Sequence, residues 1–359
     1  MQPYERIRRI KNREPVDRPA IDYIATPEFN KMIKDHLGTE DQEVVLRRVG
    51  SDIRRVDGKF IGPPDMLGAT GIKSGGRDFF GVVWKPVKNQ FATYNEITHH
   101  PLGKVTTVRE VEQYDWPSPD WWDYSGLKDE IALFNRDERY AILFFVGGAF
   151  ESPWYMRGLD RFLMDLIEYP DIAEAISYQC MKFFKARALR ALEAADGAVD
   201  MVLSGGDVGT QRGMMLSPDV WRRRIKPYSR ELIRTFKDMG LITMYHSCGS
   251  IVPVIDDFIE MGLDILDPIQ PKALGMSAKE MKAQFGDRLS FHGGIDEQEL
   301  LPRGTPRQIR AETEEIISTF GADGGYIVCS AHALQADTPV ENALAMFDAA
   351  KNYRFDGKQ

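Results

Sequence analysis

Short, nearly continuous apolar runs alternate with longer amphipathic stretches over most of the chain. Six such runs occur from about residue 140 onward, and each leads into helix-like sequence such as TPRQIRAETEEIISTF. Runs that are apolar at successive positions are typical of parallel strands buried on both faces. RPAIDYIA and DIRRVDG add two earlier strand candidates. The eight predicted strands span residues 18–25, 52–58, 141–148, 199–206, 241–249, 263–270, 289–294 and 324–331.

Eight strand-then-helix units predict a (β/α)8 TIM barrel, whose core takes about 250 residues. A doubly wound α/β sheet is the alternative that the pattern leaves open. The remaining sequence predicts an N-terminal helical extension and an aromatic-rich insertion at residues 84–125, which contains Trp116, Trp121 and Trp122. Because the insertion is short and no flexible linker flanks it, we expect one domain over residues 1–359, with the insertion near the barrel mouth.

Composition and charge narrow the functional classes. The 359 residues are 43% hydrophobic and 28% charged, as expected of a globular protein with a sizeable core. A net charge of −8, without a dense Lys/Arg block, argues against nucleic acid as a partner. No apolar run approaches the roughly 18 residues of a membrane span, and no secretory signal is visible, so we expect a cytoplasmic protein without membrane contact. The three cysteines are too few for a disulfide framework, so we expect free thiols.

Polar side chains recur at the carboxyl ends of the predicted strands, which form the active-site face of a (β/α)8 barrel. The stretch YHSCGS places His246 and Cys248 on one side of the fifth strand, and Cys329 lies near the end of the eighth. One imidazole and two thiols suit Zn²⁺, and three protein ligands leave a coordination position for substrate. The alternative is that both cysteines are small buried apolar residues and that His246 is a hydrogen-bonded core histidine.

Three further polar residues follow other strands: Glu151 after the third, Asp207 after the fourth and His292 on the seventh. Helix capping is the alternative explanation for each acidic residue, because carboxylates are favoured at helix N-termini. The sequence alone leaves both interpretations open.

Six segments follow one another along the chain: ERIRRIKNREPVDRPAI, GGAFESPWYMRGLDRFLMDLIEYPD, GGDVGTQRGMMLSPDVWRRRIKPY, YHSCGS, HGGIDEQELLPRGTPRQI and GGYIVCSAHALQADTPVENALAMFDAA. In this order they resemble the uroporphyrinogen decarboxylase superfamily. The chain is similar, within it, to the zinc-dependent, corrinoid-linked methyltransferases, which include O-demethylase and methylcobalamin:coenzyme M methyltransferases. Their His-x-Cys followed by a distant Cys is matched by His246, Cys248 and Cys329. Residues 19–46 contain no arginine, whereas the decarboxylases have an Arg-rich N-terminal segment that binds substrate propionates.

The resemblance implies Zn²⁺ held by the His246, Cys248 and Cys329 trio, with Glu151 as a fourth, displaceable ligand. Asp207 and His292 are then expected to be catalytic together with Glu151: they would orient the substrate or move a proton to a leaving oxygen.

The implied reaction moves a methyl group between a small methyl donor and the cobalt of a corrinoid, carried by a separate corrinoid-binding protein. The aromatic pairs Phe79–Phe80 and Trp154–Tyr155, with the Trp-rich insertion, favour a pocket for a methoxylated aromatic compound and therefore O-demethylation. A homodimer is compatible with the resemblance, although the sequence locates no interface.

Three alternatives stay open at this point. In a methylcorrinoid:thiol methyltransferase, zinc would hold the thiol acceptor as thiolate. In a metal-free decarboxylase of the parent family, exchange of Cys248 and Cys329 for Ser would leave activity intact. The third alternative is a non-catalytic binding protein on the same scaffold. The polar residues at the strand ends argue against it.

Overall fold

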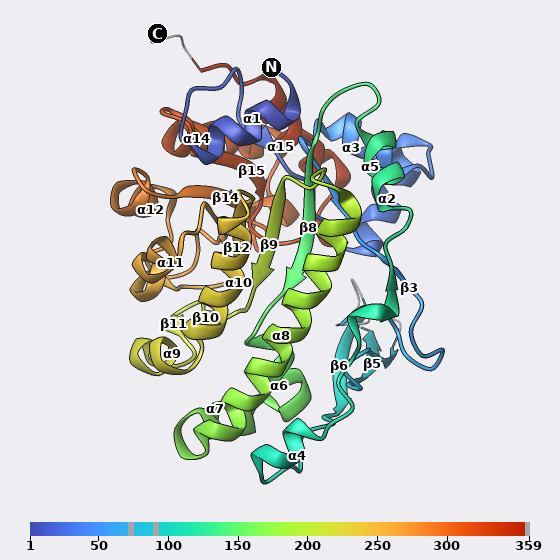
Figure 1. The fold of residues 1–359 in the computed structure, drawn as a ribbon. Coiled ribbons are helices and arrows are strands. Elements are labelled where there is room, and N and C mark those ends of the chain that lie inside the picture. Colours follow the sequence, from blue (N-terminus) through green and yellow to red (C-terminus); the bar gives the residue numbers. More distant parts are fainter. Residues whose placement is uncertain (71–74, 89–92, 356–359) are drawn as a thin grey trace.

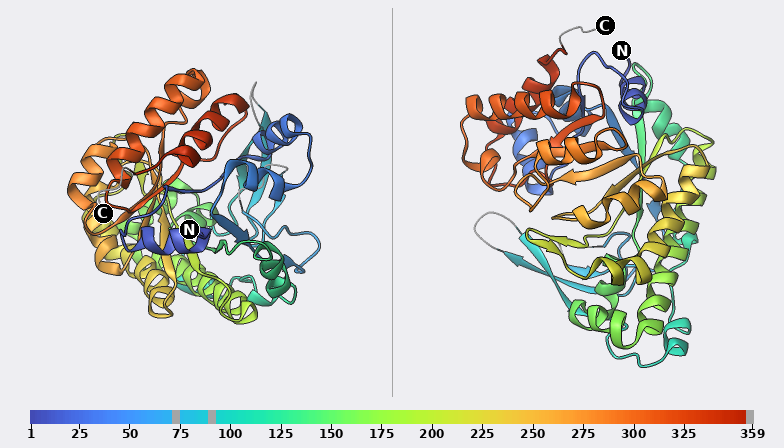
Figure 2. Two further views of the ribbon diagram at one scale, coloured as in Figure 1. Left: turned by 90° about the horizontal axis from the view of Figure 1, so that it is seen from above. Right: turned by 90° about the vertical axis from the view of Figure 1, so that its left-hand side faces the viewer.

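Eight parallel strands curl into a nearly closed barrel surrounded by helices in this computed structural model, which describes residues 1–70, 75–88 and 93–355 (Figures 1 and 2). The predicted (β/α)8 barrel is therefore confirmed. All strands lie within the ranges expected from the hydrophobic pattern, except that one extends a single residue further. In spatial order the strands are β1 (Ala20–Ile21), β15 (Tyr326–Ser330), β14 (Ser290–Ile295), β13 (Ile265–Ile269), β12 (Ile242–His246), β9 (Met201–Gly205), β8 (Ala141–Gly147) and β2 (Ile53–Val56).

Asp52 joins the two edge strands, β1 and β2. Its backbone N–H donates to the Ile21 carbonyl, and its carboxylate accepts from the Ile21 N–H, each at 2.8 Å. The same carboxylate, which is fully buried, pairs with Arg6 and Arg18. The edges of the sheet thus meet, which a doubly wound open sheet would not allow.

Helices cover the barrel wall and its amino-terminal end. The helical extension before the first strand is α1 (Pro3–Lys11), whose Ile7 and Ile10 pack with inward-facing strand residues in a core inside the barrel. The other helices are α2 (Pro27–Leu37), α3 (Gln42–Val49), α4 (Val108–Glu112), α5 (Leu127–Phe134), α6 (Glu151–Arg157), α7 (Leu159–Glu168), α8 (Pro170–Ala195), α9 (Pro218–Arg224), α10 (Lys226–Asp238), α11 (Ile255–Met261), α12 (Ala278–Phe285), α13 (Leu300–Arg303), α14 (Pro306–Gly321) and α15 (Val340–Asn352), with short 3-10 helices at Pro119–Trp121 and Val252–Val254. Within the described residues, no helix combines the length and apolar character that crossing a bilayer requires.

The alternation of side chains along β12 sets the direction of its last residue. Met244 belongs to the core inside the barrel, whereas Tyr245 faces outward and packs on Phe258 of α11, with ring centroids 4.4 Å apart. His246 therefore points inward again, at the carboxyl end of the strand. In Figure 1 this end of the barrel faces α4, α6 and α7.

A three-stranded antiparallel sheet of β4 (Gly76–Arg77), β5 (Val83–Lys88) and β6 (Thr93–His99) begins before the expected insertion at residues 84–125 and ends within it. Tyr94 Oη donates to Gln335 Oε1, beyond β15, at 3.1 Å, and the ring of Trp84 packs edge-on against Tyr155 of α6 at 5.1 Å. The hairpin of β5 and β6 therefore reaches from α6 to the loop after β15. Two short two-stranded sheets lie elsewhere in the described residues. One pairs β3 (Lys59–Phe60) with β7 (Trp122–Asp123), and the other pairs β10 (Gly209–Thr210) with β11 (Gly213–Met214).

The expectation that Phe79 and Phe80 line a pocket is wrong. Both rings are buried and contact Phe183 of α8, with centroids 5.5 and 5.3 Å apart. They belong to the core that the barrel wall and α8 form together with Trp116 and Trp122.

Candidate metal centre

The turn after β12 brings three potential ligands together. The backbone N–H of Cys248 donates to Asp207 Oδ1 at 2.7 Å, which joins this turn to the loop after β9. Gly249 allows the approach: its φ is +80°, and a Cβ there would lie 2.7 Å from the backbone of Gly209 and Thr210. The local sequence CGS thus folds so that the Cys248 side chain stands beside the neighbouring loop.

His246 Nε2 lies 3.4 Å from Cys248 Sγ and 3.6 Å from Asp207 Oδ1. The three ligand atoms all lie within 4.8 Å of one another. Bonds of about 2.0–2.3 Å to a tetrahedral zinc separate its ligand atoms by roughly 3.3–3.8 Å, so the two His246 distances fit a single cation. The His246 side chain is 28% exposed and the Asp207 side chain 33%, which leaves the cluster accessible from the barrel mouth.

The second nitrogen of His246 is held by a carboxylate. Nδ1 lies 2.6 Å from Asp267 Oδ2, on the neighbouring strand β13. Because an ionised carboxylate only accepts, this partner places a hydrogen on Nδ1 and leaves the Nε2 lone pair for the cluster.

Asp267 also begins a buried line of alternating charges. Its Oδ1 lies 2.5 Å from His292 Nδ1, a short contact that the N–H does not point along, so it is a charge–charge contact rather than an aligned hydrogen bond. His292 Nε2 contacts Asp22 Oδ2 at 3.1 Å, and Asp22 binds both terminal nitrogens of the Arg55 guanidinium, one of them at 2.8 Å. We call His246, Asp267, His292, Asp22 and Arg55 the charge chain.

Electrostatics favour an ionised charge chain. Burial by itself would lower the pKa of His292, but Asp267 and Asp22 raise it well above its ordinary value. Burial would raise the pKa of Asp22 and that of Asp267, yet Arg55 beside Asp22 and His292 beside Asp267 hold both well below the usual range. His292 therefore carries a proton on each nitrogen between two carboxylates.

Glu151 is the first residue of α6, directly after β8. Burial and the negative charge of Asp207 raise its pKa to about 7, against a lesser opposing effect of His246. Tyr155 Oη donates to Glu151 Oε1 at 3.4 Å. Glu151 therefore shares the electrostatic environment of the cluster, although its oxygens are not among the three ligand atoms within 4.8 Å.

Cys329 lies on β15 and is 1% exposed. Its Sγ is not within 4.8 Å of all three clustered ligand atoms, and it contributes instead to the electrostatics of His292 and Arg55. The structure thus brings His246, Cys248 and Asp207 together and places Cys329 beside the charge chain. Its role as a zinc ligand stays a prediction, as do the roles expected of the other site residues.

The sequence pattern alone does not single out Asp22 and Arg55. Asp22 directly follows β1 and Arg55 lies on β2, and a charged residue in or beside a barrel strand could have marked them. Their partnership could not be foreseen, because it depends on how β1 and β2 meet across the barrel.

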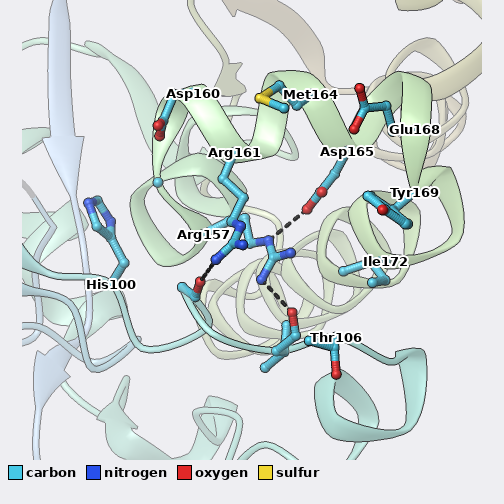
Figure 3. Close-up of a pocket in the computed structure, with 13 residues that line it drawn as sticks. His100, Thr106, Arg157, Asp160, Arg161, Met164, Asp165, Glu168, Tyr169 and Ile172 are labelled. Carbon is cyan, nitrogen blue, oxygen red and sulfur yellow. Dashed lines mark hydrogen bonds and ion pairs between the residues drawn. The ribbon is translucent and has the colours of Figure 1, made fainter.

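A separate hollow of about 620 Å³ lies outside the cluster, between the loop at residues 100–106 and the helices α6, α7 and α8 (Figure 3). Arg157, 4% exposed, pairs with Asp165 at 2.6 Å and donates to the carbonyls of Leu102 and Val105. These contacts fasten the loop to the helices, so the two buried charged side chains of this hollow, Arg157 and Asp165, already have partners within the fold.

Comparisons with known proteins agree with the fold. Residues 97–353 match the family model described as "Uroporphyrinogen decarboxylase (URO-D)". The uroporphyrinogen decarboxylase of Pelodictyon phaeoclathratiforme is 24% identical over 189 residues, 51% of this chain and 49% of that protein. That of Thermus thermophilus is 28% identical over 220 residues, 60% of each. This chain thus spans about half the length of the first of these curated relatives.

A solved structure also covers nearly the whole chain. The "methyltransferase from Methanosarcina mazei" superposes with a TM-score of 0.72 over 98% of both chains, at 18% sequence identity. At that identity the likeness establishes the shared fold.

Proposed function

This chain belongs to the uroporphyrinogen decarboxylase family, and from that premise we propose that it is a zinc-dependent methyltransferase. In this proposal it moves a methyl group between a methoxylated aromatic compound and the cobalt of a corrinoid held by a separate corrinoid-binding protein. The observation that carries the proposal is the convergence of His246 Nε2, Cys248 Sγ and Asp207 Oδ1 at spacings that suit one zinc ion.

The donor set supports zinc. Imidazole and thiol are ligands that zinc takes in proteins, and His246 already has the hydrogen on the nitrogen that faces away from the cluster. The proposed ligands are His246, Cys248 and Cys329, with the Glu151 and Asp207 carboxylates as oxygen donors for the remaining position. A zinc ion bound there would supply Lewis acidity toward an ether oxygen, or hold a thiol as thiolate.

The overall reaction balances with the partner protein as methyl acceptor. The bond between the methyl carbon and the ether oxygen breaks, Co(I) supplies the electron pair for a new bond to the methyl group, and methyl-Co(III) results. The oxygen leaves with its electron pair and takes up a proton. Glu151 is our candidate to deliver this proton when it is not bound to the cation, because burial and the charge of Asp207 raise its pKa in the metal-free protein.

The roles that we propose for His292 and Asp207 differ from the catalytic roles that the resemblance implies. His292 is fully buried with both nitrogens facing carboxylates, so we propose that it acts on the site through Asp267 and does not touch substrate. Asp207 is placed to donate an oxygen to the cation or to orient the substrate beside it.

Phe145 supports an aromatic substrate. Its neighbours on β8 alternate between the core inside the barrel, at Leu143, and the outer core, at Phe144, so Phe145 faces inward. An inward ring would normally be covered, yet Phe145 is 52% exposed. An apolar face therefore lies open inside the barrel mouth, where an aromatic ring can pack.

Decarboxylation is the second candidate, since the curated relatives named above carry that activity. A substrate with several carboxylates needs several cations, and residues 19–46 supply no arginine. Arg55, which is exposed at the mouth, is already paired with both oxygens of Asp22. These observations favour the methyltransferase.

Methyl transfer to free cob(I)alamin, used in place of the carrier protein, tests the proposal. We expect zinc-loaded protein to convert cob(I)alamin to methylcobalamin with a methoxylated benzene derivative, and Cys248→Ser to abolish the conversion. A thiol that demethylates methylcobalamin instead would favour the reverse direction of transfer. Decarboxylase activity that survives Cys248→Ser, without methyl transfer, would reject the proposal.

A further inference from the structure

We propose that Arg55 and Asp22 are positioning residues for the metal centre, acting on His246 through His292 and Asp267. The inference rests on the proposed function only in taking His246 as a metal ligand. It extends the set of residues that shape the centre to two strands on the opposite side of the barrel, β1 and β2.

The contacts form one uninterrupted line across the barrel. Arg55 binds Asp22 through both terminal nitrogens of its guanidinium. Asp22 contacts His292 Nε2 at 3.1 Å, and His292 Nδ1 lies 2.5 Å from Asp267 Oδ1. Asp267 Oδ2 then meets His246 Nδ1 at 2.6 Å. Carboxylates and basic side chains thus alternate along the line, and each interior group touches one of the other kind on either side.

Burial makes this line sensitive to the loss of any member. Asp22 and His292 are fully buried and Asp267 is 1% exposed, whereas the ends are open: the Arg55 side chain is 36% exposed and that of His246 28%. A buried charge that loses its partner is strongly unfavourable, so its neighbours must rearrange. Without Arg55, Asp22 loses its bidentate partner, and the orientations of His292 and then Asp267 are no longer fixed.

Orientation of Asp267 matters because one carboxylate serves two imidazoles. Oδ1 faces His292 and Oδ2 faces His246. A rotation that follows a displaced His292 would carry Oδ2 away from His246 Nδ1. The His246 ring would then lose the contact that aims Nε2 at Cys248 and Asp207.

A purely structural role for Arg55 and Asp22 is the competing explanation, and the barrel contains a matched control. Asp52 is also fully buried and adjoins a barrel strand as Asp22 does, and it also binds two basic side chains, here Arg6 and Arg18. Its carboxylate contacts Arg6, Arg18 and the backbone N–H of Ile21, but no side chain of the charge chain. Asp52→Asn should therefore reproduce the general cost of removing a buried carboxylate without affecting His246.

The experiment compares Asp22→Asn, Arg55→Met and Asp52→Asn with the wild type by two measurements. The first is long-range ¹H–¹⁵N spectroscopy of the histidine rings in metal-free full-length protein, where six histidines give a tractable spectrum. The second is zinc affinity, measured by competition with a chromophoric chelator. We expect Asp22→Asn and Arg55→Met to shift the ring signals of both His292 and His246 and to weaken zinc binding roughly tenfold, and Asp52→Asn to do neither.

The inference is overturned if the His246 signals and zinc affinity of Asp22→Asn and Arg55→Met equal those of Asp52→Asn. Arg55→Met removes the exposed end of the charge chain and supplies the test should Asp22→Asn fail to fold. Wild-type protein that binds no zinc would remove the proposed function, and the histidine spectra would still decide whether Arg55 acts on His246.

Discussion

His246 and Asp267 face each other directly across neighbouring parallel strands, β12 and β13, and their side chains meet at 2.6 Å between Nδ1 and Oδ2. The register of the sheet therefore decides which nitrogen of His246 carries the hydrogen. The pairing of these two neighbouring strands thus orients one ligand atom, His246 Nε2, at the barrel mouth.

Asp267→Asn tests this relationship. The amide keeps the shape of the side chain but cannot act as a charged acceptor for two imidazoles, so we expect zinc affinity to fall by about 10- to 100-fold. Asp264→Asn is the control, because Asp264 precedes the same strand, is buried and pairs with Lys237. Chelator competition measures both variants, and equal zinc affinity in Asp267→Asn and wild type would contradict the role of Asp267.

The number of sulfur atoms bound to zinc distinguishes two ligand sets. The set implied by the resemblance includes Cys248 and Cys329, whereas the cluster in the structure includes only Cys248. With Cys248 and Cys329 both bound, X-ray absorption of the zinc protein should show two sulfurs at about 2.3 Å. Cys329→Ser should then lower this number to one. A single sulfur in the wild type, unchanged in Cys329→Ser, would replace Cys329 by Asp207 in the ligand set.

The raised pKa of Glu151 predicts that the stability of the metal-free protein depends on pH. Its pKa is about 7 in the fold, against an ordinary value of 4.5 in the unfolded chain, so the folded state holds the proton more tightly. The resulting stabilisation is fully present below pH 4.5 and is lost as the pH rises toward 7, for a total of about 3 kcal/mol.

Glu151→Gln removes this proton and its pH dependence. From pH 5 to pH 8, the free energy of unfolding in urea should therefore fall further in the wild type than in the variant. Identical pH profiles for the two proteins would show that Glu151 ionises as it does in the unfolded chain.

The barrel could be predicted because parallel strands buried on both faces have a recognisable sequence. LITMYHSCG reads as a strand with a polar end, and the structure places β12 there with His246 as its last residue. The pairing of Asp22 with Arg55 could not be predicted in the same way. It joins residues 33 positions apart through strand geometry, which no local pattern records.

Residues in irregular segments were harder to place. The sequence predicts Phe79 and Phe80 at a pocket because they form an aromatic pair, but apolar area is buried wherever a partner surface is available, and α8 offers Phe183 and Phe184. Asp207 was recognised as polar at a strand end. Its contact with the Cys248 backbone depends on the close approach of Gly249 to the preceding loop, which only the fold reveals.

Metal content of the purified full-length protein tests the central claim most directly. We predict about one zinc per chain after purification without added metal, and loss of that zinc in His246→Ala and Cys248→Ser, with Cys180→Ser as the control because Cys180 lies buried in α8, away from the cluster. Wild-type protein that remains folded yet holds no zinc after incubation with it, or that keeps its zinc in both His246→Ala and Cys248→Ser, would contradict the account.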